Sequence, residues 1–152
     1  MTLHLCDTNV WLALAVSGHI HHEVTRTWLD SVDARRSVLF CRTTQQSLLR
    51  LLTSRAVLAP YGDQPLTNSE AWDVYEALIA DDRITFRPDE PAATERWWRE
   101  FAIRPAASPK LWMDAYLAAF ARAAGCRMVT TDSAFRQFNG VDLLLLGQTS
   151  TT

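Results

Sequence analysis

Five short apolar segments recur along the chain and predict the strands of one sheet. They lie at residues 3–6, 37–41, 84–86, 127–131 and 141–146. Apolar and polar positions mostly do not alternate within them, which is typical of parallel strands that are covered on both faces. We therefore expect a buried parallel sheet.

Helical patterns separate these segments. Apolar positions recur every three or four residues at 21–32, 43–53, 67–82, 91–101 and 108–125, and a further helix is expected directly after Asp7. The stretch 108–125 has the clearest boundaries, with Ser108 as N-cap, Pro109 at the first helical position and Gly125 at the end. In the stretch 67–82, Thr67 or Asn68 is the expected cap.

The alternation of strands and helices predicts an α/β fold. Such a fold has a parallel sheet, right-handed crossovers and helices on both faces of the sheet. The length of 152 residues suits one domain. We expect this domain to cover residues 1–148 and a short polar tail to occupy residues 149–152.

Composition limits the cellular compartment and the binding partners that we expect for this protein. No apolar run approaches the roughly 20 residues of a membrane-spanning helix, and the N-terminus lacks the basic region of a signal peptide, so we expect a cytoplasmic protein. Three isolated cysteines without a CxxC pair indicate buried thiols, not disulfides or a zinc site. The net charge of -2 gives no general attraction to nucleic acid. An RNA partner would therefore need local arginines and bound cations.

Three aspartates, far apart in sequence, fall at one edge of the predicted sheet. Asp7 follows the first strand directly, and Asp132 follows the fourth. Asp114 lies near the start of the helix that runs into the fourth strand, so it points to the same edge. In open α/β sheets, ligands bind outside the carboxyl ends of the strands. The topology thus predicts a cluster of three carboxylates at a ligand-binding edge.

Such a cluster favours a divalent cation. Two carboxylates about 5 Å apart repel by roughly 3 kcal/mol at an effective dielectric constant near 20. Mg²⁺ or Mn²⁺ is the expected ion, because the chain offers no His or Cys cluster at ligand spacing. Such an ion activates water and stabilises charge on a phosphate, which is the chemistry of a nuclease. Taken singly, Asp7 or Asp132 could instead cap a helix or turn, and Asp114 could face solvent.

The sequence as a whole resembles a known family. The stretches LCDTNVWLAL, TTQQSLLRLLT, SPKLWMDAYLAAFARAAG and VTTDSAFRQF are similar, in this order, to the PIN domain and in particular to the VapC-type ribonuclease toxins of toxin–antitoxin pairs. The resemblance covers nearly the whole chain. It implies a PIN-like three-layer sandwich with about five parallel strands, an acidic pocket for Mg²⁺ or Mn²⁺, endoribonuclease activity on RNA and a small antitoxin as partner.

The resemblance also assigns roles to individual residues. The family's catalytic, metal-binding acids match Asp7, Asp114 and Asp132. Its supporting polar positions match Asn9 and Thr130. A further acid usually stands at the start of the second helix of the family, and here the matching residue is Gln45, which brings no charge. We expect Gln45 to act as a supporting polar residue and the ion to be held with one fewer negative charge.

Contacts outside the acids are less well determined by the sequence. The candidates for RNA or phosphate contacts are basic residues expected near the same edge of the sheet, namely Arg42, Arg50, Lys110 and Arg136. Scattered, solvated arginines are the alternative, and Arg50 could also pair with an acid of the pocket. Apolar helix faces around Trp72 or Trp97 suggest a homodimer.

The sequence leaves three functions open. The first is a metal-dependent endoribonuclease that is the toxin of a type II toxin–antitoxin pair. The second is a degenerate PIN module that binds RNA or a partner without cutting, which the neutral Gln45 favours. The third is a phosphohydrolase with an aspartyl nucleophile, although such enzymes require a second acid where Asn9 stands.

Overall fold

A computed structural model describes residues 1–148 and contains the predicted parallel sheet. Its five strands are β1 (His4–Cys6), β2 (Val38–Phe40), β3 (Ile84–Phe86), β4 (Arg127–Thr130) and β5 (Leu143–Leu145). They pair in the order β3-β2-β1-β4-β5, and every pair is parallel. The chain builds the sheet outward from β1 in one direction and then returns to the other side of β1 with β4. The carboxyl ends of β1 and β4 therefore form the switch point of the sheet.

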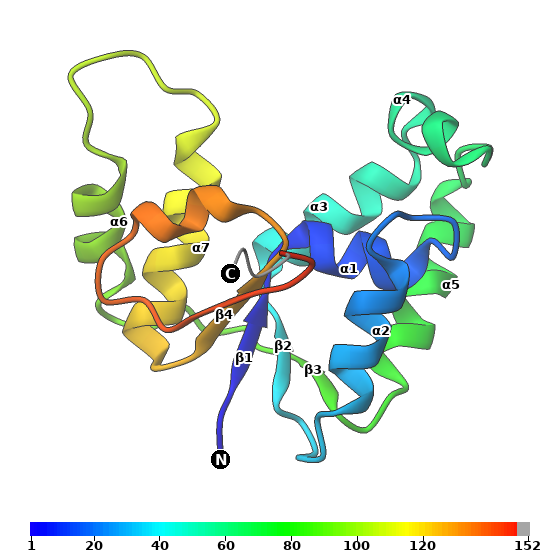
Figure 1. Cartoon of the computed structure of the whole chain (residues 1–152), viewed down its shortest axis with the longest axis horizontal. Helices are drawn as coiled ribbons and strands as arrows, with labels where there is room; N and C mark the ends of the chain where they lie inside the picture. The colour runs from blue at the N-terminus through cyan, green and yellow to red at the C-terminus, as the bar shows by residue number, and fades with distance from the viewer. Residues whose placement is uncertain (149–152) are drawn as a thin grey trace.

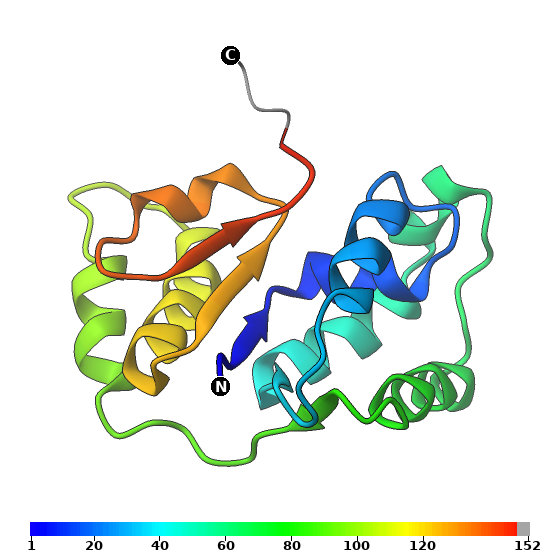
Figure 2. The ribbon, with the colours of Figure 1, turned by 60° about the horizontal axis from the view of Figure 1, so that its bottom comes forward.

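Helices cover both faces of the sheet (Figures 1 and 2). The helices are α1 (Thr8–Ala15), α2 (His22–Asp30), α3 (Arg42–Leu52), α4 (Arg55–Leu58), α5 (Asn68–Ile79), α6 (Thr94–Ala102) and α7 (Leu111–Ala124), with two 3-10 turns, η1 (Ala59–Tyr61) and η2 (Ser133–Gln137). One apolar core lies between the sheet and helices α1, α2, α3 and α5. A second core lies between the opposite face and α6, α7 and η2. This three-layer α/β arrangement confirms the predicted fold class.

The helix boundaries follow the sequence signals in part. Thr67 caps α5, and Glu70 returns a hydrogen bond to the Thr67 backbone. Gly125 ends α7 in the left-handed conformation, with φ of 68°. The predicted N-terminus of α7 is wrong, because the helix begins at Leu111 after Lys110. Ser108 instead closes a separate turn, in which its carbonyl accepts a hydrogen bond from the Leu111 N–H at 3.0 Å.

The sequence also makes predictions about the cysteines, the helix lengths and the C-terminal tail. All three cysteines are buried and free, as predicted. No helix within residues 1–148 combines the length and apolar character needed to cross a membrane. The predicted polar tail, residues 149–152, lies outside the described residues. The extent of the domain therefore stays a prediction.

Candidate active site at the carboxyl end of the sheet

Asp7 lies at the switch point, where β1 passes into α1. It occupies the N-cap position of α1, yet its side chain makes no capping hydrogen bond. Its Oδ2 atom instead accepts a hydrogen bond of 2.9 Å from the hydroxyl of Thr130, at the end of β4. Only 6% of Asp7 is exposed. The neighbouring strand therefore holds this carboxylate through Thr130.

Thr130 also fixes the position of Asp132. The Thr130 Oγ1 atom accepts a hydrogen bond of 3.0 Å from the Asp132 N–H while donating to Asp7. Asp132 Oδ1 accepts a hydrogen bond of 2.9 Å from the Ala134 N–H and so caps η2. The capping role considered for Asp132 is therefore real, and it occupies only one of the two carboxylate oxygens.

Asp114 reaches this edge from the opposite layer. It lies in the first turn of α7, which runs antiparallel to the strands and packs against β1 and β4. The side chain is half-buried. Within residues 1–148 it makes neither a hydrogen bond nor an ion pair, so its carboxylate has no protein group to compensate for its burial.

The charges of the three aspartates act on one another. Burial raises the pKa of Asp7 to about 6, with further contributions from the charges of Asp114 and Asp132, while hydrogen bonds from Thr130 and the Thr8 amide oppose the shift. Burial, followed by the charge of Asp132, raises the pKa of Asp114 to about 6. Ion pairs to a Lys, Arg or His are absent from all three aspartates in the described chain. The fold thus concentrates uncompensated negative charge at this edge.

The fit of a metal ion to these residues follows from their chemistry. The donors are all carboxylate oxygens, which suit a hard divalent cation such as Mg²⁺ or Mn²⁺. Across residues 1–148, however, no three His, Cys, Asp or Glu side chains are arranged to hold a metal ion. Carboxylates without a counter-ion repel one another, and hydrogen bonds retain Asp7 and Asp132. The donor type and charge fit the ion, and closure around it requires side-chain movement.

The two other polar candidates, Asn9 and Gln45, differ in exposure and in their contacts. Asn9 is exposed in the first turn of α1. Gln45 is buried at the start of α3, and its Oε1 atom accepts a hydrogen bond of 2.5 Å from Arg42 Nη1. Burial raises the pKa of Tyr75, on α5, and a hydrogen bond with the Gln45 side chain opposes that shift. The structure therefore directs Gln45 toward Arg42 and Tyr75.

The four basic candidates form no ion pairs with acids in the described part of the chain. Arg42 lies over the ring of Phe86, 4.4 Å from its centroid. Lys110 precedes the first residue of α7, and Arg136 belongs to η2, which begins beside Asp132. These cations are available for an anionic ligand, and their contacts with RNA stay a prediction.

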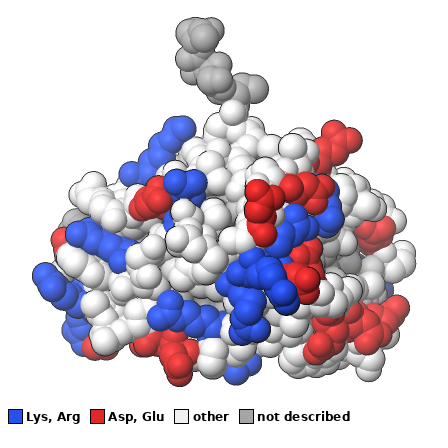
Figure 3. All heavy atoms as spheres, turned by 90° about the horizontal axis from the view of Figure 1, so that it is seen from below, with Lys and Arg blue, Asp and Glu red and all other residues white. Residues whose placement is uncertain are grey.

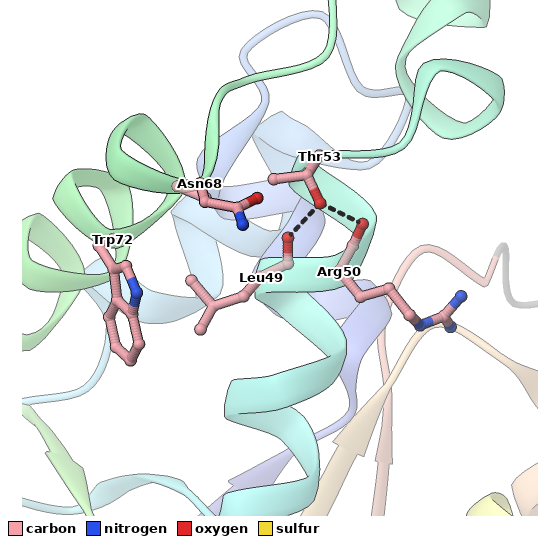
Figure 4. A pocket seen from close by; sticks show the side chains of 6 residues that line it. Leu49, Arg50, Thr53, Asn68 and Trp72 are labelled. Atoms are coloured by element: carbon pink, nitrogen blue, oxygen red, sulfur yellow. Dashed lines mark hydrogen bonds between the residues drawn. The ribbon is translucent and has the colours of Figure 1, made fainter.

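Arg50 borders a small pocket between α3 and α5. The pocket has a volume of about 280 Å³ and is lined by Leu49, Arg50, Thr53, Asn68, Ala71 and Trp72. Figure 4 shows the Arg50 guanidinium pointing away from Asn68 and Trp72. The Thr53 hydroxyl closes this end of α3 by donating to the carbonyls of Leu49 and Arg50. Trp72 is half-exposed here, and the expected homodimer stays a prediction.

Two polar contacts near the acids were not anticipated from the sequence. The Tyr116 hydroxyl, two residues beyond Asp114, donates a hydrogen bond of 2.7 Å to Glu90 Oε1. Arg104 Nη2, in the connection between α6 and α7, donates one of 2.9 Å to Gln137 Oε1 in η2. Glu90 and Arg104 lie in irregular segments without periodicity, so no sequence signal placed them at this edge.

Comparison with known proteins identifies the family. The family model described as PIN domain matches residues 5–141. Ribonuclease VapC41 of Mycobacterium tuberculosis is 58% identical over 144 residues, which cover 95% of this chain and 99% of that protein. Ribonuclease VapC29 of the same organism is 30% identical over 147 residues, covering 97% of this chain and 98% of that protein.

A solved structure shares the fold. In the crystal structure of VapBC2 from Rickettsia felis, bound to a DNA fragment from their promoter, one chain superposes with a TM-score of 0.68 and 12% identity. The superposition covers 95% of this chain and 99% of that one. These findings confirm the resemblance seen in the sequence. The chain belongs to the PIN domain family, among its VapC-type members.

Proposed function

We propose that this chain is a metal-dependent endoribonuclease and the toxin of a type II toxin–antitoxin pair, acting in the cytoplasm. Asp7, Asp114 and Asp132 are its catalytic and metal-binding residues. The observation that carries this proposal is the convergence of three mutually repelling carboxylates, without a protein cation, at the switch point of the sheet. The 58% identity to a protein named ribonuclease VapC41 supports the same activity.

The three aspartates would hold Mg²⁺ or Mn²⁺. When bound, such an ion supplies an activated water and neutralises charge on the phosphate. Thr130 holds Asp7 and Asp132 in fixed relative positions. Asp114 has no hydrogen bond to the described protein, so its side chain is free to turn toward a ligand. The unpaired Lys110 and Arg136 attract the RNA backbone.

The proposed protein partner is a small antitoxin. The Rickettsia felis structure that shares the fold is one of VapBC2 bound to a DNA fragment from their promoter. An antitoxin that covers the acidic edge would keep RNA from Asp114 and its neighbours. Co-expression with the product of an adjacent small gene, followed by co-purification, tests this part of the proposal.

Cleavage of purified RNA tests the enzymatic part. The wild-type protein should cleave RNA with Mg²⁺ or Mn²⁺ and lose this activity with EDTA. Asp114→Asn should reduce cleavage at least about a hundredfold, because a charge next to the reacting phosphate is removed. Asp142→Asn is the matched control, because Asp142 pairs with Arg127 at the amino end of β4. Equal cleavage by wild type and Asp114→Asn would show that a contaminating nuclease is responsible.

The second candidate is a PIN module that binds without cutting. The neutral Gln45 favours it, because α3 then adds no charge to the acids, and the Gln45 side chain accepts its hydrogen bond from Arg42. Calorimetry with Mn²⁺ distinguishes the two functions. A catalytic site should bind Mn²⁺ with an affinity that falls in Asp7→Asn, whereas a vestigial site should show no saturable binding.

A further inference from the structure

An exposed apolar surface lies at the junction of α6 and α7. Ile103 is 75% exposed, Trp112 57% and Met113 47%, although all three are large and apolar. Beside them is a groove of about 370 Å³, which is lined by Glu95, Trp98, Arg99, Ala102, Ile103 and Trp112. This volume is in the range of pockets that bind small organic groups. The surface is therefore shaped to receive a ring-sized apolar group.

The two tryptophans of the groove are held in a fixed arrangement. Trp98 Nε1 donates a hydrogen bond of 2.9 Å to the carbonyl of Trp112. Their rings lie 6.1 Å apart at 74°, and the Tyr116 ring meets Trp98 at 86°. A rigid aromatic surface loses little conformational entropy when a second ring stacks on it.

The groove lies at the same end of the molecule as the aspartates. Trp112 stands two residues before Asp114 in the first turn of α7. The connection that follows Ile103 is tied to η2, because Arg104 donates its hydrogen bond to Gln137 there. Asp132 begins η2. A strand of RNA with one phosphate at the acids can therefore extend along this rim to the groove.

The acid in the lining of the groove is paired. Glu95 lies 3.7 Å from Arg99, which also lines the groove. Arg104 lines the adjoining hollow together with Ile103 and Trp112, and Lys110 follows Pro109 of that hollow in sequence. On the opposite end of the molecule, basic side chains are interspersed with Asp and Glu (Figure 3). Pairs there include Arg127 with Asp142 and Arg83 with Asp81. The groove thus combines an aromatic surface with a neighbouring cation, Arg104, that forms no ion pair within residues 1–148, which suits a base and its neighbouring phosphates.

On the basis of the proposed function, we infer that this groove holds an unpaired base of the RNA substrate, with the Trp112 indole as the stacking surface. Base–aromatic stacking is tolerant of sequence and requires a base that is not stacked in a helix. Arg104 and Lys110 contact the adjoining phosphates. The groove therefore selects single-stranded or extruded nucleotides, and an apolar protein segment is the competing occupant, which the experiment separates.

The experiment measures RNA binding separately from cleavage. A fluorescein-labelled single-stranded oligoribonucleotide of mixed sequence is titrated with Asp114→Asn protein in EDTA, so that the RNA stays intact. Adding Trp112→Ala should weaken binding by roughly five- to a hundredfold, as expected for the loss of one stacked base. Trp112→Phe should retain most of the affinity. Trp72→Ala removes a similarly exposed tryptophan on α5 and should change nothing.

The outcomes distinguish this inference from the proposed function. Equal RNA binding by Trp112→Ala and Trp72→Ala would overturn the stacking role, even if the wild type cleaves RNA. Loss of antitoxin binding in Trp112→Ala, with RNA binding intact, would reassign the groove to a protein. Conversely, absence of cleavage by the wild type would refute the nuclease, while binding that depends on Trp112 would retain the RNA site.

Discussion

The hydroxyl of Thr130 donates a hydrogen bond of 2.9 Å to Asp7 Oδ2, across 123 positions of sequence. The Thr130 Oγ1 atom also accepts a hydrogen bond of 3.0 Å from the Asp132 N–H. One buried hydroxyl therefore links two acids that the parallel pairing of β1 and β4 brings side by side. Thr130 thus holds the Asp7 carboxylate and the Asp132 backbone with a neutral group, which adds no charge to the acidic edge.

Replacing Thr130 tests this positioning role. Thr130→Val should weaken Mn²⁺ binding by about 10- to 100-fold and reduce RNA cleavage similarly, as for other groups that orient metal ligands. Thr130→Ser should restore both, because it keeps the hydroxyl. Isothermal titration calorimetry and a cleavage assay measure the two effects. Thr25→Val is the matched control, since the buried Thr25 hydroxyl donates within α2 to the His21 carbonyl. An equal loss in Thr25→Val would mean that the effect is general destabilisation.

The raised pKa of Asp7 predicts a pH-dependent cost to stability. The pKa is about 6 in the folded protein, compared with an ordinary value of 3.8. The folded state therefore retains a proton that the unfolded state releases, so the contribution of Asp7 to the free energy of unfolding is greatest below about pH 4 and falls up to about pH 6. Asp7→Asn lacks this term and should gain about 2 to 3 kcal/mol over the wild type across that interval.

Denaturant titrations in EDTA, at several pH values between about 4 and 7.5, give the difference in unfolding free energy between wild type and Asp7→Asn. The difference isolates Asp7 from other titrating groups, such as Asp81. Hydrogen bonds from Arg83 lower the pKa of Asp81 to about 2. If the unfolding free energies of the two proteins changed with pH in parallel, burial would not raise the pKa of Asp7.

A bound divalent cation should relieve the repulsion among the carboxylates of Asp7, Asp114 and Asp132. Mn²⁺ at about a hundred times its Kd should raise the melting temperature by about 5 to 10 °C near pH 7.5. Near pH 5 the increase should be much smaller, because Asp7 and Asp114, with pKa values of about 6, are then largely protonated. Differential scanning fluorimetry measures the shift. An identical shift in the Asp7→Asn, Asp114→Asn double variant would place the ion elsewhere.

The gathering of the acids could be predicted because it depends on topology. Apolar runs without alternation indicated parallel strands, and parallel strands end at one edge. The pairing of β1 with β4 then places Asp7 near Asp132, and Gly125 turns α7 back so that Asp114 reaches the same edge. These relations need only the order of the elements, which the spacing of apolar residues determines well.

The orientation of individual side chains could not be predicted in this way. Gln45 as a supporting polar residue stays a prediction, and its hydrogen bonds with Arg42, one turn before it, and with Tyr75 on another helix were not expected from the sequence. Ser108 had the residue type of an N-cap, but the chain closes a separate turn before α7 begins. In both cases a contact between residues three positions apart competes with the predicted one, and the spacing of apolar residues does not distinguish these local alternatives.

Restoring the acid that the family usually carries at Gln45 tests its orientation. Gln45→Glu should pair with Arg42, which already donates to Gln45 Oε1, and should leave the Kd for Mn²⁺ within about twofold of the wild type. Calorimetry measures the affinity, and Gln46→Glu on the exposed side of α3 is the control for added charge. Tenfold tighter binding by Gln45→Glu alone would mean that this position faces the ion.

The basic residues at the carboxyl edge should give RNA binding its dependence on salt. If Lys110 and Arg136 each contact one RNA phosphate, then neutralising either should reduce the slope of log K against log salt concentration by about 0.7, the value for single strands. Lys110→Gln and Arg136→Gln, compared by fluorescence anisotropy on the Asp114→Asn background, measure these slopes. Arg127→Gln is the control, because Arg127 pairs with Asp142 at the far end of the sheet and should keep the full slope. A uniform decrease in all three variants would indicate attraction by net charge alone, since only a local contact releases counterions from a particular phosphate.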